Sequence, residues 1–234
     1  MWTADASVIV ARWGDQEVRA ALFDFNGTLS DDEHLLQEVF AEIFVKRFGW
    51  SMTEAHYQRH LRGLSDREIV ERVAHDHSDE QPDIEAMLAE RRDLYIVRAR
   101  AQPPIGPGAR DLVRALRSQG ALTGIVTGAR RYEVDCVLDL CGLGETFDVV
   151  VTEEDASRGK PDPEGYLLAT RHLNVPPEAC LVFEDSGVGV RAARRAGMTV
   201  LAVGEDSNAA EDTGRSGRAE AHGRVAVLSP SLLG

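Results

Sequence analysis

The sequence has no long apolar run, no even set of cysteines and no basic N-terminal start, and each absence excludes a class of protein. No stretch of 18 or more apolar residues occurs among its 234 residues, so no membrane-spanning helix is predicted. The three cysteines fit neither a disulfide framework nor a metal-ligand spacing. Because the first residues also lack the pattern of a secretory signal, we expect a cytoplasmic protein.

Positive charge is also scarce. The chain carries 26 Lys and Arg against 39 Asp and Glu, a formal net charge of −13. A surface of this sign repels the phosphate backbone of nucleic acids, so no nucleic-acid partner is expected. The apolar fraction of 43% is enough for a sizeable core, and the length fits one large domain or a core with a smaller insertion.

One short segment, Ala21–Leu29, organises the rest of the chain. The apolar run that ends at Phe23 predicts a buried strand, and Asp24 follows it directly. Open α/β sheets bind ligands at the carboxyl ends of their strands, where Asp24 would lie. Gly27 permits a tight turn that brings backbone N–H groups close to an anion. A turn or helix-capping role for Asp24 is the alternative that the segment alone leaves open.

A block of helices follows this segment without a strand between them. Apolar residues recur at helical spacing after residue 34 until Gly49, and further helices are predicted at 53–61, 65–75 and 82–101. A stretch rich in Pro and Gly, 103–108, then breaks the helical pattern. We therefore predict a helical insert at residues 34–104, within a core formed by residues 1–33 and 105–234.

Helices and strands alternate in the second part of the core. The pattern predicts strands at 122–126, 147–151, 180–183 and 199–203, and helices at 109–118, 132–140, 164–173 and 188–196. A last apolar piece is present at 225–228, after a polar, Gly-rich tail, and Val8–Val10 fits either a strand or a loosely ordered tail. Such alternation indicates an α/β fold with a parallel sheet and helices on both faces.

Four short polar segments lie at the ends of these predicted strands or before the following helix. They contain Asp24, then Thr127 and Gly128, then Lys160, then Glu184 with Asp185. In a parallel sheet such ends share one edge, so these residues are expected to converge. Carboxylates without a His/Cys cluster suit Mg²⁺, and a lysine, a hydroxyl and turn N–H groups suit phosphate oxygens. Phosphoryl transfer requires mainly such positioning and charge neutralisation.

The order and spacing of the four motifs are highly specific as a set. They are Phe23–Leu29, Val126–Gly128, Gly159–Pro163 and Phe183–Gly189, and Arg191–Ala193 and Ala196–Met198 extend the last of them. Together they resemble the haloacid dehalogenase superfamily of phosphatases and phosphomutases. The resemblance covers about residues 20–204. It implies a Rossmann-like core with an inserted helical cap of the type found in β-phosphoglucomutase-like and phosphoglycolate phosphatase-like members.

The resemblance also implies roles for individual residues. Asp24 would be the nucleophile that forms an aspartyl-phosphate, and a Mg²⁺ ligand. The metal site would be completed by the backbone carbonyl of Asn26 and by the side chains of Asp185 and Glu184. Thr127, Gly128, Gly27 and Lys160 would hold the phosphoryl group of a small phosphorylated metabolite, with Thr127 and Lys160 also counted as catalytic. The chain is expected to be a monomer or a homodimer.

The sequence departs from the family pattern at one catalytic position. Family phosphatases usually carry an aspartate, a general acid and base, two residues after the nucleophile, whereas this chain has Asn26. Loss of acid–base help costs about 10²–10⁴-fold in rate. Three interpretations remain open: an activated phosphate as substrate, a substitute proton donor among residues 31–34, or a protein that binds a phosphorylated ligand with weak turnover.

The helical insert is expected to select the substrate. Its most polar turn, Arg62–Arg67, contains the two candidate contacts Arg62 and Ser65, although a solvent-exposed helix–helix turn explains the same residues. A phosphomutase is a further alternative. The histidine of β-phosphoglucomutase that follows its first motif would fall at Leu36, which favours hydrolysis instead. Dehalogenation is disfavoured by Glu184 and Asp185, since spare carboxylates repel an anionic substrate.

Overall fold

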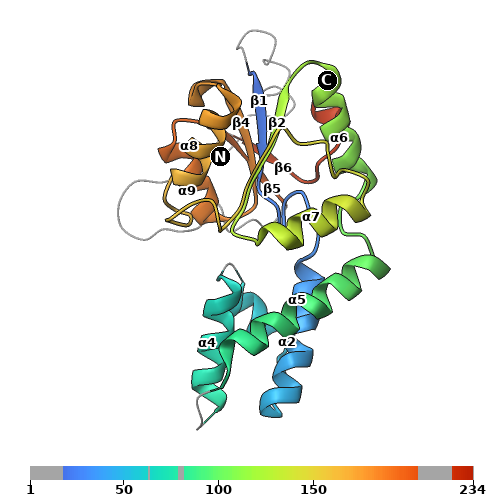
Figure 1. Cartoon of the computed structure of the whole chain (residues 1–234), viewed down its shortest axis with the longest axis vertical. Coiled ribbons are helices and arrows are strands. Elements are labelled where there is room, and N and C mark those ends of the chain that lie inside the picture. Colours follow the sequence, from blue (N-terminus) through green and yellow to red (C-terminus); the bar gives the residue numbers. More distant parts are fainter. Residues whose placement is uncertain (1–17, 63, 79–81, 205–222, 234) are drawn as a thin grey trace. The chain divides into compact units, whose positions relative to one another are not determined.

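The computed structural model describes residues 18–62, 64–78, 82–204 and 223–233. The chain divides into two compact units, one formed by Met1–Asp31 and Ile105–Gly234 and the other by Asp32–Pro104. The segment Val8–Val10 and most of the polar tail before residue 223 lie outside the described residues. The first unit contains a sheet with helices, and the second consists of helices (Figure 1).

A six-stranded sheet forms the centre of the first unit. Its strands are β1 (Ala20–Phe23), β2 (Leu122–Val126), β3 (Val149–Val151), β4 (Cys180–Glu184), β5 (Thr199–Val203) and β6 (Gly223–Val225). They run in the order β3-β2-β1-β4-β5-β6, and every neighbouring pair is parallel. The short strand β1 therefore lies in the middle, paired with β2 on one side and β4 on the other.

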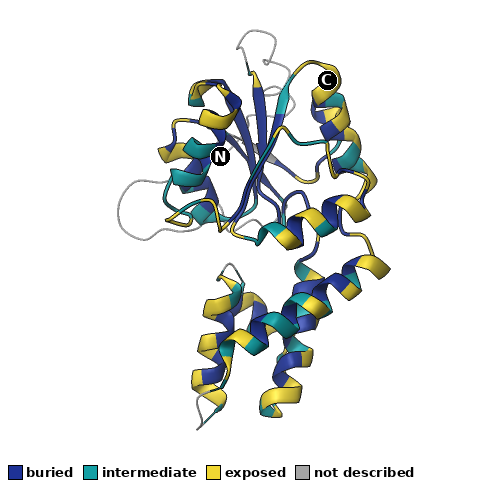
Figure 2. Ribbon diagram, viewed as in Figure 1, coloured by how far each residue is buried: buried dark blue, intermediate teal, exposed yellow. Residues whose placement is uncertain are grey.

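Helices cover both faces of this sheet, which confirms the predicted α/β fold class. The helices of the unit are α6 (Pro107–Ser118), α7 (Arg131–Leu140), α8 (Glu164–Leu173) and α9 (Gly187–Arg195). Because side chains alternate along a strand, Leu22 packs with residues of α8 and α9, and Phe23 points to the opposite face. All four residues of β1 are fully buried, as the dark blue strands of Figure 2 illustrate.

Local interactions explain the small differences between predicted and observed boundaries. Helix α6 begins at Pro107 and not at Ala109, since proline suits the first position of a helix, and Gly106 precedes it as the N-cap. Strand β3 begins two residues later than predicted. The side chain of Asp148 accepts a hydrogen bond from the Thr123 N–H at 2.8 Å just before the strand starts. The last apolar piece contributes only Val225 to a strand.

The second unit is helical throughout its regular structure. Its elements are α2 (Glu33–Phe48), α3 (Glu54–His56), the π-helix η2 (Tyr57–Leu61), α4 (Asp66–His77) and α5 (Ile84–Ala101). Gly49 ends α2 with φ 64°, as its position in the sequence predicts. Ser65 and Glu68 form the predicted capping box at the start of α4. The helix predicted at 53–61 is an α-helical turn followed by a π-helix, a change that periodicity cannot reveal.

Two short 3₁₀ turns, η3 (Pro177–Ala179) and η5 (Pro230–Leu233), complete the elements of the first unit. Among the described residues, no helix is both apolar enough and long enough to traverse a lipid bilayer. This finding agrees with the lack of long apolar runs in the sequence.

The aromatic stack at the centre of the sheet generates a stability prediction. Phe23 and Phe183 lie on adjacent strands, are fully buried, and stack with ring centroids 4.8 Å apart. Replacing Phe183 by alanine should lower the free energy of unfolding by about 3–5 kcal/mol, because it leaves a cavity in a closely packed core. Urea denaturation measures this loss.

The matched control is Val227→Ala in the same unit, where the side chain is 69% exposed. This variant should change the free energy of unfolding by less than about 0.5 kcal/mol. A similar loss in both variants would show that the stack does not stabilise the sheet.

Candidate active site

Parallel strand pairing brings Asp24, Glu184 and Asp185 to one edge of the sheet. Asp24 follows β1, and its N–H donates to the carbonyl of Phe183 in β4 at 2.9 Å. Glu184 ends β4 and Asp185 follows it. Carboxylate oxygens of these three residues all lie within 4.8 Å of one another. Asp24, which precedes Glu184 by 160 positions in the sequence, thus joins Glu184 and Asp185 in one cluster.

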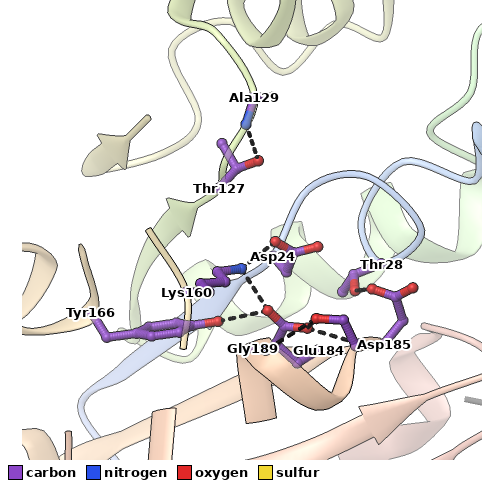
Figure 3. Close-up of polar contacts among 10 residues, drawn as sticks. Asp24, Thr28, Thr127, Ala129, Lys160, Tyr166, Glu184, Asp185 and Gly189 are labelled. Atoms are coloured by element: carbon purple, nitrogen blue, oxygen red, sulfur yellow. Dashed lines mark hydrogen bonds and ion pairs between the residues drawn. The ribbon is translucent and has the colours of Figure 1, made fainter. Parts of the chain in front are cut away.

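Lys160 supplies the positive charge of this cluster. Its ammonium group donates to Asp24 Oδ1 and, at 2.5 Å, to Glu184 Oε1 (Figure 3). The same group lies 5.3 Å from the centre of the Tyr166 ring, within the range of a cation–π interaction. The segment before α8 therefore places one lysine between two acids from neighbouring strands.

Burial and charge shift the pKa values of both partners of the central ion pair. Burial, then the charges of Glu184 and Asp185, raise the pKa of Asp24 well above its usual range, and the charge of Lys160 opposes them. Burial alone would lower the pKa of Lys160, but Asp24 and Glu184 together outweigh it and raise that pKa. Lys160 is therefore a permanent cation, while Asp24 depends on a positive charge to remain an anion.

Glu184 is held by donors from three residues. Its Oε1 accepts from Lys160 and from the Tyr166 hydroxyl at 3.2 Å, and its Oε2 accepts from the N–H and hydroxyl of Ser186 at 3.0 and 2.9 Å. The carboxylate is fully buried. Gly189 makes room for it, because a Cβ at that position would lie 1.6 Å from Glu184 Oε1.

Asp185 lies against the turn that follows Asp24. The Thr28 hydroxyl donates to Asp185 Oδ1 at 3.1 Å. Gly27 has φ 76°, and a Cβ there would lie 2.5 Å from Asp185 Oδ2. The Gly27 N–H donates to the carbonyl of Ser30 at 2.8 Å, so the glycine closes the turn and admits the Asp185 carboxylate.

Thr127 and Gly128 follow β2, next to the Asp24 turn in the sheet order. Thr127 is buried, and its hydroxyl accepts from the Ala129 N–H at 3.0 Å. Gly128 is exposed, and no heavy atom lies within 4 Å of the position that a Cβ would occupy. The Thr127 N–H also donates to the carbonyl of Val151 at 3.0 Å, so the N–H groups on both sides of Gly128 have partners.

Asn26 is half-buried in the turn between Asp24 and Ser30 and forms an isolated bridge with Ser30. The acidic residues considered as substitute proton donors differ in their surroundings. Asp31 is exposed, whereas Asp32 is buried and accepts from the Tyr95 hydroxyl in the helical unit. Asp32 is therefore occupied by a structural hydrogen bond.

The two candidate substrate contacts of the helical unit both have partners within that unit. Ser65 donates to Glu68 Oε2 at 2.7 Å and accepts from the Glu68 N–H, as a helix cap does. Arg62 lies 3.8 Å from Glu33 and donates to Gln58 at 3.3 Å. Capping and ion pairing account for these residue types without a substrate.

Four further residues, not predicted from the sequence as site residues, shape the acid cluster: Thr28, Tyr166, Ser186 and Gly189. Thr28, Ser186 and Gly189 lie inside the motifs, so their positions in the sequence indicated that they are near the site. Tyr166 gave none, because a buried tyrosine in a helix is indistinguishable from a core aromatic.

Comparison with known proteins assigns the chain to a family. The model of the haloacid dehalogenase-like hydrolases matches residues 18–197, which include every strand up to β4 and all four motifs. The chain belongs to this family. It is therefore a hydrolase, and the expected superfamily is confirmed.

Several relatives of this hydrolase act on phosphorylated small molecules according to their names. It is 36% identical over 187 residues to validoxylamine A 7'-phosphate phosphatase of Streptomyces hygroscopicus subsp. limoneus, with 77% of this chain and 83% of the relative covered. It is 31% identical to a phosphorylated carbohydrates phosphatase of Thermotoga maritima, with coverages of 77% and 82%.

A solved structure shows the same architecture. A mutant of CbbY from Rhodobacter sphaeroides in complex with xylulose-(1,5)bisphosphate superposes with a TM-score of 0.74 at 27% identity. The alignment covers 91% of this chain and 95% of the CbbY chain.

The close fit between Gly189 and Glu184 generates a prediction. The Gly189→Ala variant should lower the free energy of unfolding by about 1–3 kcal/mol, because the added methyl group displaces a buried carboxylate. This loss should exceed the gain of about 1 kcal/mol that alanine brings to a helix. Chemical denaturation gives the measurement.

Gly128→Ala is the matched control, since open space surrounds its Cβ position. It should change stability by less than about 0.5 kcal/mol. Equal stability of the Gly189→Ala variant and the unmodified protein would mean that Glu184 is free to move aside.

Proposed function

We propose that this hydrolase is a Mg²⁺-dependent phosphatase that acts on a small phosphorylated metabolite through an aspartyl-phosphate on Asp24. One observation carries the proposal: Asp24, Glu184 and Asp185 meet at a single edge of the sheet, and Lys160 bonds the first two. Three carboxylates and one lysine have a net negative charge, which would repel a phosphate ester. A divalent cation would neutralise that charge.

The donor set fits Mg²⁺ because all the side-chain donors are carboxylate oxygens. Asp24, Asp185 and the backbone carbonyl of Asn26 would be the ligands. Glu184 would ligate or hold the metal shell, and its four protein donors favour the holding role. When bound, the ion would neutralise charge on the phosphoryl oxygens.

The proposed reaction has two steps. A carboxylate oxygen of Asp24 attacks phosphorus, and the bond from phosphorus to the ester oxygen breaks with its electron pair on the leaving group. Water then attacks the phosphorus of the acyl phosphate, which releases inorganic phosphate and restores Asp24. Lys160, Thr127 and the N–H groups near Gly128 hold the phosphoryl oxygens, and the charge of Lys160 also favours the ionised form of Asp24.

Asn26 determines which leaving groups are favourable. An amide cannot donate a proton to the departing oxygen or accept one from the attacking water. A leaving group that is stable as an anion, as in an acyl phosphate or an aryl phosphate, needs no such proton. The same residue supports the second candidate function, a regulatory protein that binds a phosphorylated ligand and turns it over slowly.

The substrate class is inferred from the relatives and from the helical unit. The named relatives are phosphatases of a validoxylamine phosphate and of phosphorylated carbohydrates, so we propose a phosphorylated, sugar-like metabolite. Arg62 and Ser65 are the proposed contacts from the helical unit. A mutase reaction is disfavoured because the position of the expected histidine is held by Leu36, a buried apolar residue of α2.

The metal dependence and the nucleophile can be tested together. The protein should release inorganic phosphate from p-nitrophenyl phosphate in the presence of Mg²⁺, and EDTA or the Asp24→Ala substitution should abolish release. Asp24→Ala should remain folded, as judged by circular dichroism. Full activity in EDTA, or in the Asp24→Ala variant, would overturn the proposal.

The role of Asn26 has its own test. The Asn26→Asp variant should hydrolyse alkyl phosphates about 10²–10⁴-fold faster, because it restores a general acid and base. Hydrolysis of p-nitrophenyl phosphate should change much less, since its leaving group needs no proton. Initial rates on a panel of sugar phosphates and aryl phosphates measure both effects.

An equal change for both substrate types would show that Asn26 does not limit the proton transfer. Binding of a sugar phosphate by calorimetry without its consumption would instead identify the slow, ligand-binding protein.

A further inference from the structure

The segment that carries Lys160 has little apolar anchorage. Residues 153–155 and 157–159 are exposed, and Ala156 and residues 160–165 are only half-buried. The nearest buried side chains along the chain are Thr152 after β3 and Tyr166 in α8. Because apolar burial does not fix this segment, its polar contacts must do so.

Glu164 accepts hydrogen bonds from two neighbouring residues of this segment, Ser157 and Arg158. Its Oε1 accepts from the N–H and hydroxyl of Ser157 at 3.1 and 2.8 Å. Its Oε2 accepts from the N–H and Nε of Arg158 at 3.1 and 3.2 Å. The bonds from Ser157, then those from Arg158, lower the pKa of Glu164 to about 2, so the carboxylate is an anion throughout the physiological pH range.

Asp162 adds further polar contacts within the same segment. Its Oδ1 accepts from the Glu164 N–H at 3.0 Å, its Oδ2 lies 3.2 Å from Arg158 Nη1, and its own N–H donates to the Gly159 carbonyl at 3.0 Å. Lys160 lies between these fastened points, and its side chain extends to Asp24 and Glu184. Ser157 and Arg158 are thus joined to Glu164, the first residue of α8, while the Lys160 side chain extends into the acid cluster.

We propose that Glu164 is a positioning residue for Lys160. By joining Ser157 and Arg158 to the start of α8, it holds the Lys160 ammonium between Asp24 and Glu184. The inference rests on the proposed function, in which Lys160 contacts the phosphoryl group. Glu164 itself touches neither the phosphoryl group nor the acid cluster, and it acts through the backbone of residues 157–160.

The lysine content of the chain provides a readout that does not depend on activity. The sequence contains only two lysines, Lys46 and Lys160. The Lys46 side chain is 63% exposed, whereas that of Lys160 is 16% exposed. Acylation with an N-hydroxysuccinimide ester, followed by mass spectrometry, therefore compares a protected lysine with an internal reference in one molecule.

In the unmodified protein, Lys160 should be acylated much more slowly than Lys46. Glu164→Ala should raise the ratio of Lys160 to Lys46 acylation severalfold, because the released segment exposes the ammonium group. Glu164→Gln should give an intermediate ratio, since one of the two acceptor oxygens is kept. The Glu164→Gln variant also allows the acylation ratio to be measured if the Glu164→Ala variant fails to fold.

The matched control is Asp148→Asn. Asp148 likewise accepts from a backbone N–H and an arginine, Thr123 at 2.8 Å and Arg117 at 2.7 Å, but it precedes β3 at the other end of the strand. This variant should leave the acylation ratio unchanged. The same ratio in the unmodified protein and both Glu164 variants, or an equal rise in Asp148→Asn, would overturn the proposal.

Kinetics then separates positioning from general stability. Glu164→Ala should lower kcat for p-nitrophenyl phosphate by about 10–10²-fold, the cost of a misplaced catalytic group. In a Lys160→Ala background the same substitution should cost nothing further, because its effect passes through Lys160. Equal losses in both backgrounds would overturn the proposal. If the unmodified protein hydrolyses no phosphate ester, the proposed function fails, and the acylation ratios alone decide the role of Glu164.

Discussion

The ion pair between Lys160 and the acids around it is the interaction on which the rest of the site depends. Parallel strands place Asp24, Glu184 and Asp185 at one edge, where burial and the charges of the two other acids raise the pKa of Asp24. A buried charge without a partner costs several kcal/mol, so the cluster requires a cation in its midst. Lys160 fills this role with two short contacts and a neighbouring aromatic ring.

Close packing around the carboxylates limits which residues the chain tolerates there. Gly27 and Gly189 each occupy a position where a Cβ would overlap a carboxylate, of Asp185 and Glu184 respectively. The hydroxyls of Thr28 and Tyr166 donate to Asp185 and Glu184 respectively. Glycines and hydrogen-bond donors together keep the acid side chains in one arrangement, which a site for phosphoryl transfer needs before its substrate arrives.

Family membership identifies the class of reaction, whereas the residue at position 26 bears on proton transfer. The family model spans the motifs and identifies a hydrolase. Asn26 forms a bridge with Ser30, and its amide cannot exchange a proton as a carboxyl group can. In the proposed reaction, the fold would hold Asp24 for attack on phosphorus, and the choice of leaving group would follow from the Asn26 amide.

The sequence by itself determined the features that arise from local interactions. Strand β1, the end of α2 at Gly49, the capping box of Ser65 and the alternation of strands with helices all follow from residues close together in the chain. Only the tertiary structure decided the order of the strands and the partners of Asp185 and Glu184. Thr28 and Asp185 are 157 positions apart, and no periodicity encodes such a contact. It exists because β1 and β4 pair side by side, a choice made by the packing of the whole sheet.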